Sequence, residues 1–327
     1  MPRISIVKGE NRKENIASAI KLIENDIEKA IKSKKLKQLF IKINAIDSSF
    51  PLACTHADAL EIVLNIFHDK FDEIVVGDNT FVFGKYKGGP YRKMLERFPK
   101  VRFSDLTDFE TANINFKKLN GNVIGKISLL PKTAFTISLA LPKTHDAFVY
   151  TGCLKNMLGC VIDNRPSVHA LNPYDRLWLN RYVKSNKFKW GNLVSVIEKT
   201  KPDLCILDGY EGMEGTGPLF GKGIKLGIAM CSLDGITLDK LAAKICGINY
   251  VPYLSLLSHD SEDIEIIREG FKNMSEIEKE FKLHPNTKYQ IMSEELLIPR
   301  PDTRLIISLL RRPYRIKDKI MEKLKRI

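Results

Sequence analysis

Short apolar runs alternate with amphipathic stretches of helical period along most of this chain. Candidate strands lie at 4–7, 39–43, 73–77, 135–141, 204–207 and 226–230, and candidate helices at 11–32, 56–70 and 238–246. Strands and helices that follow one another in this way favour parallel strands joined by right-handed crossovers. The pattern therefore predicts an α/β fold with a mostly parallel sheet and flanking helices.

The segment 80–132 interrupts this alternation with clustered turn residues. Asn120-Gly121-Asn122 is a turn signal between the apolar stretches 114–116 and 123–127. We therefore predict an antiparallel hairpin insertion near 100–130, beside the main sheet.

Composition places the chain among ordinary globular proteins. Of its 327 residues, 44% are hydrophobic and 28% charged, and no apolar run approaches the roughly 20 residues that span a bilayer. The first residues lack the apolar core of a secretory signal, so we expect a cytoplasmic protein. The six cysteines are scattered without a CxxC pair, so ferredoxin-type and zinc-ribbon sites are not expected. The net charge of +13 suits anionic partners.

The end of the chain is more basic than the rest. We expect a domain of residues 1–300, with two Rossmann-like lobes at about 1–132 and 133–260, followed by a tail of residues 301–327. Apolar residues of the tail recur at helical spacing, which indicates a basic amphipathic helix: Ile316, Ile320, Leu324 and Ile327. Such a helix either docks on the domain or on a second copy in a homo-oligomer, or makes weak contact with an anionic membrane surface.

Three polar residues, Lys143, Thr144 and His145, follow a candidate strand and Pro142. Ligands of parallel α/β sheets bind at this end of the strands. Lysine offers a charge for a carboxylate or phosphate, threonine a hydroxyl, and histidine a proton acceptor or metal ligand near neutral pH. The alternative interpretation is a turn with solvated side chains.

The motif that begins at Thr151 predicts a helix with Thr151 as its N-cap and with Lys155 and Asn156 in its first turns. Backbone N–H groups at a helix start bind anions, whereas a lysine there opposes the helix dipole. We therefore expect an anion or an acidic side chain near Lys155. Arg165 and His169 follow in a loop and complete this part of the predicted site.

Three carboxylates, Asp208, Glu211 and Glu214, follow another candidate strand and are interleaved with glycines. Glycine permits close approach and φ > 0, so we predict a shaped loop. Its carboxylates suit a divalent metal or a general acid, and they equally suit ion pairs with Lys143 and Lys155. The glycine order matches neither the dinucleotide-binding nor the P-loop motif.

Several single polar residues come at the ends of strands or at the start of a helix. Asn44, Asp78 and Asp234 each follow a strand, and His56 begins a helix. Each alone suits an N-cap or a turn. Together they favour one polar crevice along the ends of the strands.

These motifs together resemble the DUF362 family, a group recognised by sequence whose chemistry is largely unassigned. The matching segments are Ile41–Asn44, Thr55-His56, Val75–Asp78, Pro142–His145, Thr151–Cys160, Asp208-Gly209 through Glu214–Pro218, and Asp234 with Asp239. Many relatives carry an added ferredoxin-like module with clustered cysteines. This sequence lacks that module, so the resemblance implies no intrinsic iron–sulfur cluster here.

The Thr-His, Gly-Asp and strand-end pattern also faintly resembles the N-terminal domain of the lactate racemase family. Those enzymes hold a nickel-pincer cofactor with Lys and His. The resemblance implies that such a scaffold can host a Lys/His site for a small carboxylate and a cofactor.

The leading hypothesis is a cytoplasmic enzyme that binds a small carboxylate or phosphate substrate, with or without a divalent metal. Isomerase or oxidoreductase chemistry is favoured, although the spacing does not choose a reaction. The assigned residues are His145, Lys155, Asp208 and Glu214 for catalysis, Asn44, Asp78, Lys143, Thr144, Asn156 and His169 for substrate, and Glu211 with Asp208 and Glu214 for metal.

Two other classes remain open. One is a redox or cofactor-handling protein with a redox partner, which the ferredoxin-bearing relatives suggest. The other is a binder of nucleic acid or of a membrane surface through the basic tail. No RRM, KH or helix-turn-helix signature is evident, so nucleic acid is not the expected partner.

Overall fold

The computed structural model describes residues 1–47, 49–79, 91, 94, 97–170, 179–257, 263–287 and 290–291. The predicted tail of residues 301–327 lies outside the described residues. None of the helices among those described is both long and apolar enough to cross a membrane.

Within the described residues, the main sheet has ten strands. They are β1 (Arg3–Lys8), β2 (Gln38–Lys42), β3 (Glu73–Asp78), β4 (Val101–Asp105), β7 (Phe135–Ala140), β8 (Lys143–His145), β9 (Val149–Thr151), β11 (Leu204–Glu214), β12 (Lys222–Ser232) and β13 (Glu265–Glu269). Their order across the sheet is β13-β1-β12-β11-β7-β2-β3-β4. Outside this order, β8 pairs with β11 and with β9. All the candidate strands of the sequence are present.

The sheet is mostly parallel, as predicted. Strands β11, β7, β2, β3 and β4 run parallel, whereas β12 is antiparallel to both β11 and β1. The two expected lobes, about 1–132 and 133–260, share this sheet because β7 pairs directly with β2. The division into lobes stays a prediction.

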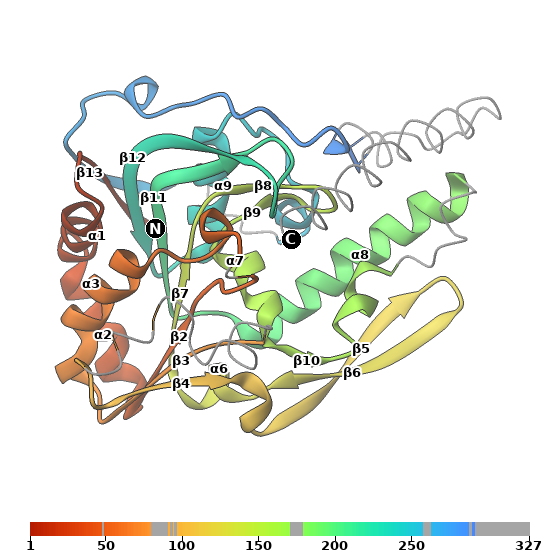
Figure 1. Ribbon diagram of the computed structural model, residues 1–327, viewed down its shortest axis with the longest axis horizontal. Helices are drawn as coiled ribbons and strands as arrows, with labels where there is room; N and C mark the ends of the chain where they lie inside the picture. The colour runs from red at the N-terminus through yellow and green to blue at the C-terminus, as the bar shows by residue number, and fades with distance from the viewer. Residues whose placement is uncertain are drawn as a thin grey trace.

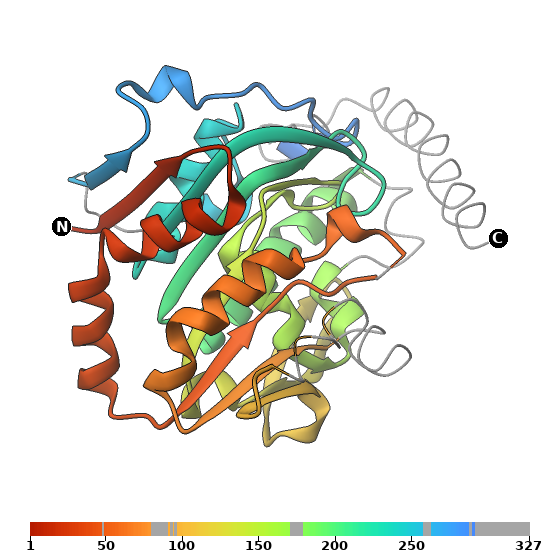
Figure 2. The same ribbon diagram turned by 60° about the vertical axis from the view of Figure 1, so that its left-hand side comes forward.

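Helices cover both faces of the sheet (Figure 1; Figure 2). They are α1 (Arg12–Lys21), α2 (Glu24–Lys34), α3 (Ala57–Phe67), α6 (Leu130–Thr133), α7 (Cys153–Asn156), α8 (Leu179–Thr200), α9 (Gly235–Ile245) and α10 (Pro252–Ser255). One apolar core lies between the sheet and α1 to α3, and a second lies between the sheet and α7 to α10. Short 3₁₀ turns join the elements: η1 (Pro51–Ala53), η2 (His68–Lys70), η4 (Leu106–Asp108), η5 (Met157–Cys160), η6 (Arg165–His169) and η8 (Met274–Glu276).

Helix starts follow the capping residues in the sequence. Asn11 accepts hydrogen bonds from backbone N–H groups of α1, His56 caps α3, and Asp234 caps α9. These roles confirm the N-cap interpretation of His56 and Asp234. The single helix expected at 11–32 is two helices, α1 and α2, because the backbone leaves the helical conformation at Ile23.

A second sheet holds the predicted hairpin. Its strands are β5 (Thr111–Lys118), β6 (Gly121–Ser128) and β10 (Val161–Asp163), all antiparallel. Lys118 pairs with Gly121, whose φ of +111° is readily adopted only by glycine. Helix α8 packs on β5 and carries this sheet beside the main one (Figure 1).

Candidate functional site

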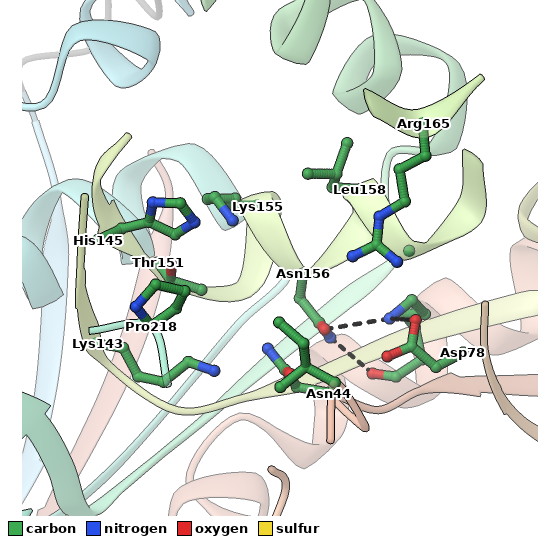
Figure 3. Close-up of a pocket in the computed structure, with 13 residues that line it drawn as sticks. Asn44, Asp78, Lys143, His145, Thr151, Lys155, Asn156, Leu158, Arg165 and Pro218 are labelled. Carbon is green, nitrogen blue, oxygen red and sulfur yellow. Dashed lines mark hydrogen bonds and ion pairs between the residues drawn. The ribbon is translucent and has the colours of Figure 1, made fainter. Parts of the chain in front are cut away.

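A small cavity opens at the carboxyl ends of β2, β3 and β7 (Figure 3). Its volume is about 30 Å³. That exceeds the roughly 10–15 Å³ needed by one water and is far below the roughly 300–1,000 Å³ of a drug-sized pocket. The lining residues are Lys42, Asn44, Ile46, Asp78, Lys143, His145, Thr151, Lys155, Asn156, Leu158, Gly159, Arg165 and Pro218. The cavity suits a small group rather than a nucleotide.

One side of the cavity is a balanced ion pair. Lys42 Nζ lies 2.9 Å from Asp78 Oδ1 and donates to Asn156 Oδ1 at 3.2 Å. The Asn156 amide donates in turn to the Lys42 carbonyl at 2.8 Å. A Cβ on Gly159 would lie 2.0 Å from Asp78 Oδ1, so only glycine lets α7 and η5 approach this pair. Asn156 thus positions the pair and also faces the cavity.

Lys143 is a second buried cation, and it is held by neutral groups. Its ammonium donates to the Ala53 carbonyl at 2.6 Å. The side-chain oxygen of Asn44 lies 3.2 Å from the same ammonium in the amide orientation that satisfies both groups. Burial and the nearby Lys42 lower the pKa of Lys143 to about 8. At neutral pH this lysine is still mainly cationic.

Lys155 differs from the other cations of the cavity because it has no polar partner among the described residues. Its side chain is buried, with 8% exposure, and its Nζ lies 5.0 Å from the centre of the Phe148 ring. Among the described residues, no hydrogen bond or ion pair of this ammonium is found. Burial, and then the charges of Lys143 and Arg165, lower the pKa of Lys155 to about 7. Arg165 itself donates to the Asn79 carbonyl at 2.8 Å.

His145 is neutral at physiological pH. Burial, and then the charge of Lys155, lower its pKa to about 3. Its Nδ1 lies 3.0 Å from the backbone nitrogen of Ala147. Asp146 Oδ1 lies 2.9 Å from the same Nδ1 and favours the charged ring. Burial outweighs this contact.

The charge on the cavity is strongly unbalanced. Four cationic side chains line it, whereas Asp78 is the one carboxylate among the described lining residues. Asp78 is already paired with Lys42. Burying like charges without compensation costs free energy, so the arrangement favours either loss of protons or binding of an anion.

The three carboxylates of the predicted loop do not join this site, which corrects the sequence interpretation. Residues 208–214 are strand, because β11 runs to Glu214 in a long hairpin with β12. Leu204 and Ile206 face α1 to α3, and strand alternation places Asp208 on that same face, away from α7. The turn after β11 still reaches the cavity through Pro218.

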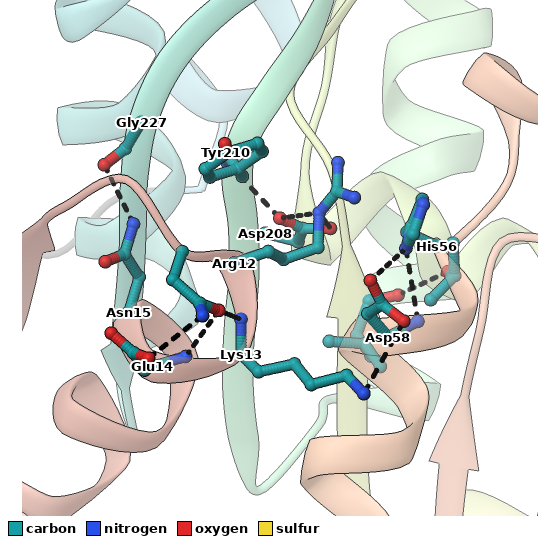
Figure 4. A network of polar contacts seen from close by, with 12 residues as sticks. Arg12, Lys13, Glu14, Asn15, His56, Asp58, Asp208, Tyr210 and Gly227 are labelled. Carbon is teal, nitrogen blue, oxygen red and sulfur yellow. Dashed lines mark hydrogen bonds and ion pairs between the residues drawn. The ribbon is translucent and has the colours of Figure 1, made fainter.

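Asp208 belongs instead to a balanced network beside α1 (Figure 4). Arg12 Nε lies 3.1 Å from Asp208 Oδ2, and its guanidinium lies 4.9 Å from the centre of the Tyr210 ring. Burial raises the pKa of Asp208 to about 6, although Arg12 opposes the rise. Next to it, Lys13 pairs with Glu61 and with Asp58.

The predicted metal group is not assembled. Glu211 is exposed, and Glu214 accepts the backbone N–H of Lys282 at 2.8 Å. Across the part of the chain that the structure describes, no group of three or more His, Cys, Asp or Glu side chains could hold a metal ion. Six residues of an extended strand span roughly 20 Å, so Asp208 and Glu214 lie too far apart to share one ion.

Two further residues lie beside the cavity rather than on it. The Thr144 hydroxyl donates to the Gly215 carbonyl at 3.0 Å and fixes the turn after β11. His169 packs edge-on against Phe148, with ring centres 5.2 Å apart, behind the ring that Lys155 contacts. Neither side chain lines the described cavity.

The start of α7 differs from the prediction. Thr151 lies in β9, and Gly152 is the N-cap without a side-chain hydrogen bond. The first N–H groups, of Cys153 and Leu154, donate to the buried carboxylate of Asp239 at 2.9 and 2.8 Å. The N–H groups at this helix start are therefore held by Asp239 of α9, whose pKa burial raises to about 7, and they are not free for a ligand. The carboxyl group that acts on Lys155 itself is Asp146.

Sequence reasoning missed Lys42 and Phe148. A lysine within the apolar run 39–43 was a usable signal, because a buried strand has no need of a charge unless a partner faces it. Phe148 gave no signal, since its role depends on the β8–β9 hairpin that folds it against Lys155.

The fold and the cavity define an α/β protein with a cation-rich site at the carboxyl ends of its strands. Residues 39–244 match the family described as a domain of unknown function, DUF362. The chain belongs to the DUF362 family, and the resemblance read from its motifs is confirmed.

Two known proteins are similar to parts of the chain. The thylakoid-associated protein sll1697 of Synechocystis sp. is 30% identical over 104 residues, which are 32% of this chain and 29% of that protein. The lactate racemase apoprotein of Thermoanaerobacterium thermosaccharolyticum matches with a TM-score of 0.45 and 10% identity, over 75% of this chain and 58% of that one. The chain thus spans less than two thirds of either protein.

Proposed function

We propose that the cavity binds a small anion, a carboxylate or a phosphate group, and that the protein is an enzyme acting on the molecule that carries it. The observation that carries this proposal is the excess of cations at the cavity. Lys42, Lys143, Lys155 and Arg165 line a cavity whose one described carboxylate is already paired. A bound anion would offset the charges of the buried Lys143 and Lys155 and of the half-buried Arg165.

The residues divide between binding and proton transfer in this proposal. Lys143 and Arg165 would hold the anion, because backbone carbonyls fix both of their positions. Lys155, with a pKa of about 7, and neutral His145 would exchange protons with the bound molecule. Isomerisation and oxidoreduction both require such transfer, so the reaction type stays open.

Anion binding is tested by calorimetry and thermal shift with oxalate, acetate and inorganic phosphate. We expect at least one of them to bind the wild-type protein at the cavity. Lys155→Met should weaken that binding about 10- to 100-fold, because a hydrogen bond to a charged group contributes about 1.5–3 kcal/mol. Lys225→Met is the matched control, since it removes an exposed cation on β12 that lies over Tyr210 rather than at the cavity.

Two results would contradict the proposal. One is a wild-type protein that binds none of the three anions. The other is equal weakening by Lys155→Met and Lys225→Met, which would assign the binding to general surface charge.

A further inference from the structure

Lys155 stands apart from the other cations of the cavity in how it is held. Lys42, Lys143 and Arg165 each donate to a backbone carbonyl, at 2.6, 2.6 and 2.8 Å respectively. Lys155 meets the face of Phe148 instead and lines the cavity with no polar contact among the described residues. A lysine whose role is only to carry a charge would be stabilised by a backbone carbonyl, as the other three cations are. The geometry therefore leaves the nitrogen of Lys155 free to react.

We propose, on the basis of the anion site above, that Lys155 is a nucleophile that condenses with the carbonyl group of a small oxo acid. Lys143 and Arg165 hold the carboxylate of that acid, and the carbonyl carbon then faces the Lys155 nitrogen across the cavity. The small volume of about 30 Å³ restricts the substrate class to short-chain oxo acids.

The reaction balances without an added oxidant or cofactor. The free amine adds to the carbonyl carbon, so a carbon–nitrogen bond forms and the carbonyl π bond becomes a hydroxyl after proton transfer. The carbon–oxygen bond then breaks, water leaves with the second amine proton, and an imine of Lys155 remains. The Nε2 of His145 has no hydrogen-bond partner among the described residues and carries the ring proton in one of the two neutral tautomers. It can therefore donate a hydrogen bond to the carbonyl oxygen.

The surroundings of Lys155 lower its pKa, and the lowered pKa supplies the neutral amine that this step requires. The groups that face Lys155 come from several elements: Lys42 of β2, Lys143 and His145 of β8, Arg165 and His169 of η6, and Asp146 with Phe148 between β8 and β9. The cations oppose a charged Lys155, whereas Asp146 and the ring favour it. Burial decides the balance and brings the pKa to about 7. An ordinary lysine has a pKa near 10.4, so Lys155 holds on the order of 10³ more free amine at pH 7.

The experiment is reductive trapping on the full chain. The protein is incubated with glyoxylate, the smallest oxo acid, and with cyanoborohydride, and the modified lysines are mapped by mass spectrometry. We expect a carboxymethyl group on Lys155 well before any other lysine, with a rate that rises with pH and levels off above about pH 7. Lys42 is the internal control, because its nitrogen is held by Asp78 at 2.9 Å and by the Ile43 carbonyl at 2.6 Å.

Two further samples separate the chemistry from the binding. Lys155→Arg keeps a cation in the cavity, so it should retain binding of oxalate and lose the adduct. Acetaldehyde lacks the carboxylate, so it should label Lys155 no faster than exposed lysines.

The outcomes distinguish this inference from the proposed function. Oxalate binding without an adduct on Lys155, or labelling spread evenly over the lysines, overturns the nucleophile and leaves the anion site. Absence of both oxalate binding and adduct overturns both proposals. Because the adduct is mapped on the wild-type protein, the test holds even if Lys155→Arg fails to fold.

Discussion

The cavity and the network around Arg12 bury charge on opposite faces of the same sheet, and they do so in opposite ways. Around Arg12 the charges are paired: the largely buried Arg12 with the buried Asp208, and the more exposed Lys13 with Glu61. At the cavity, three cations are left after Lys42 and Asp78 have paired. Figures 3 and 4 show the two regions.

The difference separates a structural arrangement from a binding one. A buried ion pair holds elements together and is costly to break, because removing one partner leaves the other buried without a counter-charge. An unbalanced cluster is suited to bind a partner that the described residues do not supply. Substitutions should therefore affect stability in the first region and ligand binding in the second.

The largest effect is expected for Arg12→Met. It leaves Asp208 buried without its partner, which costs roughly 3–5 kcal/mol in comparable pairs. Asp208 can escape by taking up a proton, so we expect a loss near 3 kcal/mol in the free energy of unfolding, measured with urea. Anion binding at the cavity should be unchanged. A drop in anion affinity with intact stability would break the comparison.

A smaller effect is expected from pH, acting through Asp208. Its pKa is about 6 in the folded protein and about 3.9 in the unfolded chain, so the folded state binds the proton more tightly. Its contribution to stability is thus full below about pH 4 and is lost as the pH rises through 6. The shift of about two units corresponds to about 3 kcal/mol at most. Unfolding of wild type and Asp208→Asn at pH 4 to 7 isolates this group. Wild type should lose stability relative to Asp208→Asn as the pH rises, and a relative gain would contradict the sign.

The smallest effect is expected for the stability of Lys155→Met without ligand. The change removes an unpaired buried cation and replaces it with an apolar side chain of similar length, so unfolding should shift by less than about 1 kcal/mol in either direction. A loss as large as that of Arg12→Met would show that Lys155 is structural, and the contrast between the two regions would disappear.

The fold was largely predictable because strand and helix periodicity are local signals. The strands at 39–43 and 135–141 and the hairpin at 114–127 appear where the apolar pattern and the Asn-Gly turn place them. The break between α1 and α2 was not predictable, because the apolar repeat of the sequence continues across Ile23.

The candidate site was predictable in part. Lys143, His145, Lys155 and Asn44 come together because carboxyl ends of parallel strands meet at one edge, which the order of elements already implies. Asp208 was misplaced because its glycine neighbours resemble a loop, whereas pairing with β12 keeps the segment extended. Such pairing is a long-range contact that local sequence does not encode.

The pairing of β1 with β12 has a consequence for synthesis of the chain. Ile4 lies opposite Ser232, so an early strand waits for a partner made more than two hundred residues later. At about 5–20 residues per second a ribosome needs roughly ten to fifty seconds to supply it. Throughout that interval the apolar side chains of Ile4 and Ile6, fully buried in the finished protein, lack their final neighbours. The nascent chain is therefore a natural client for chaperones that shield such strands.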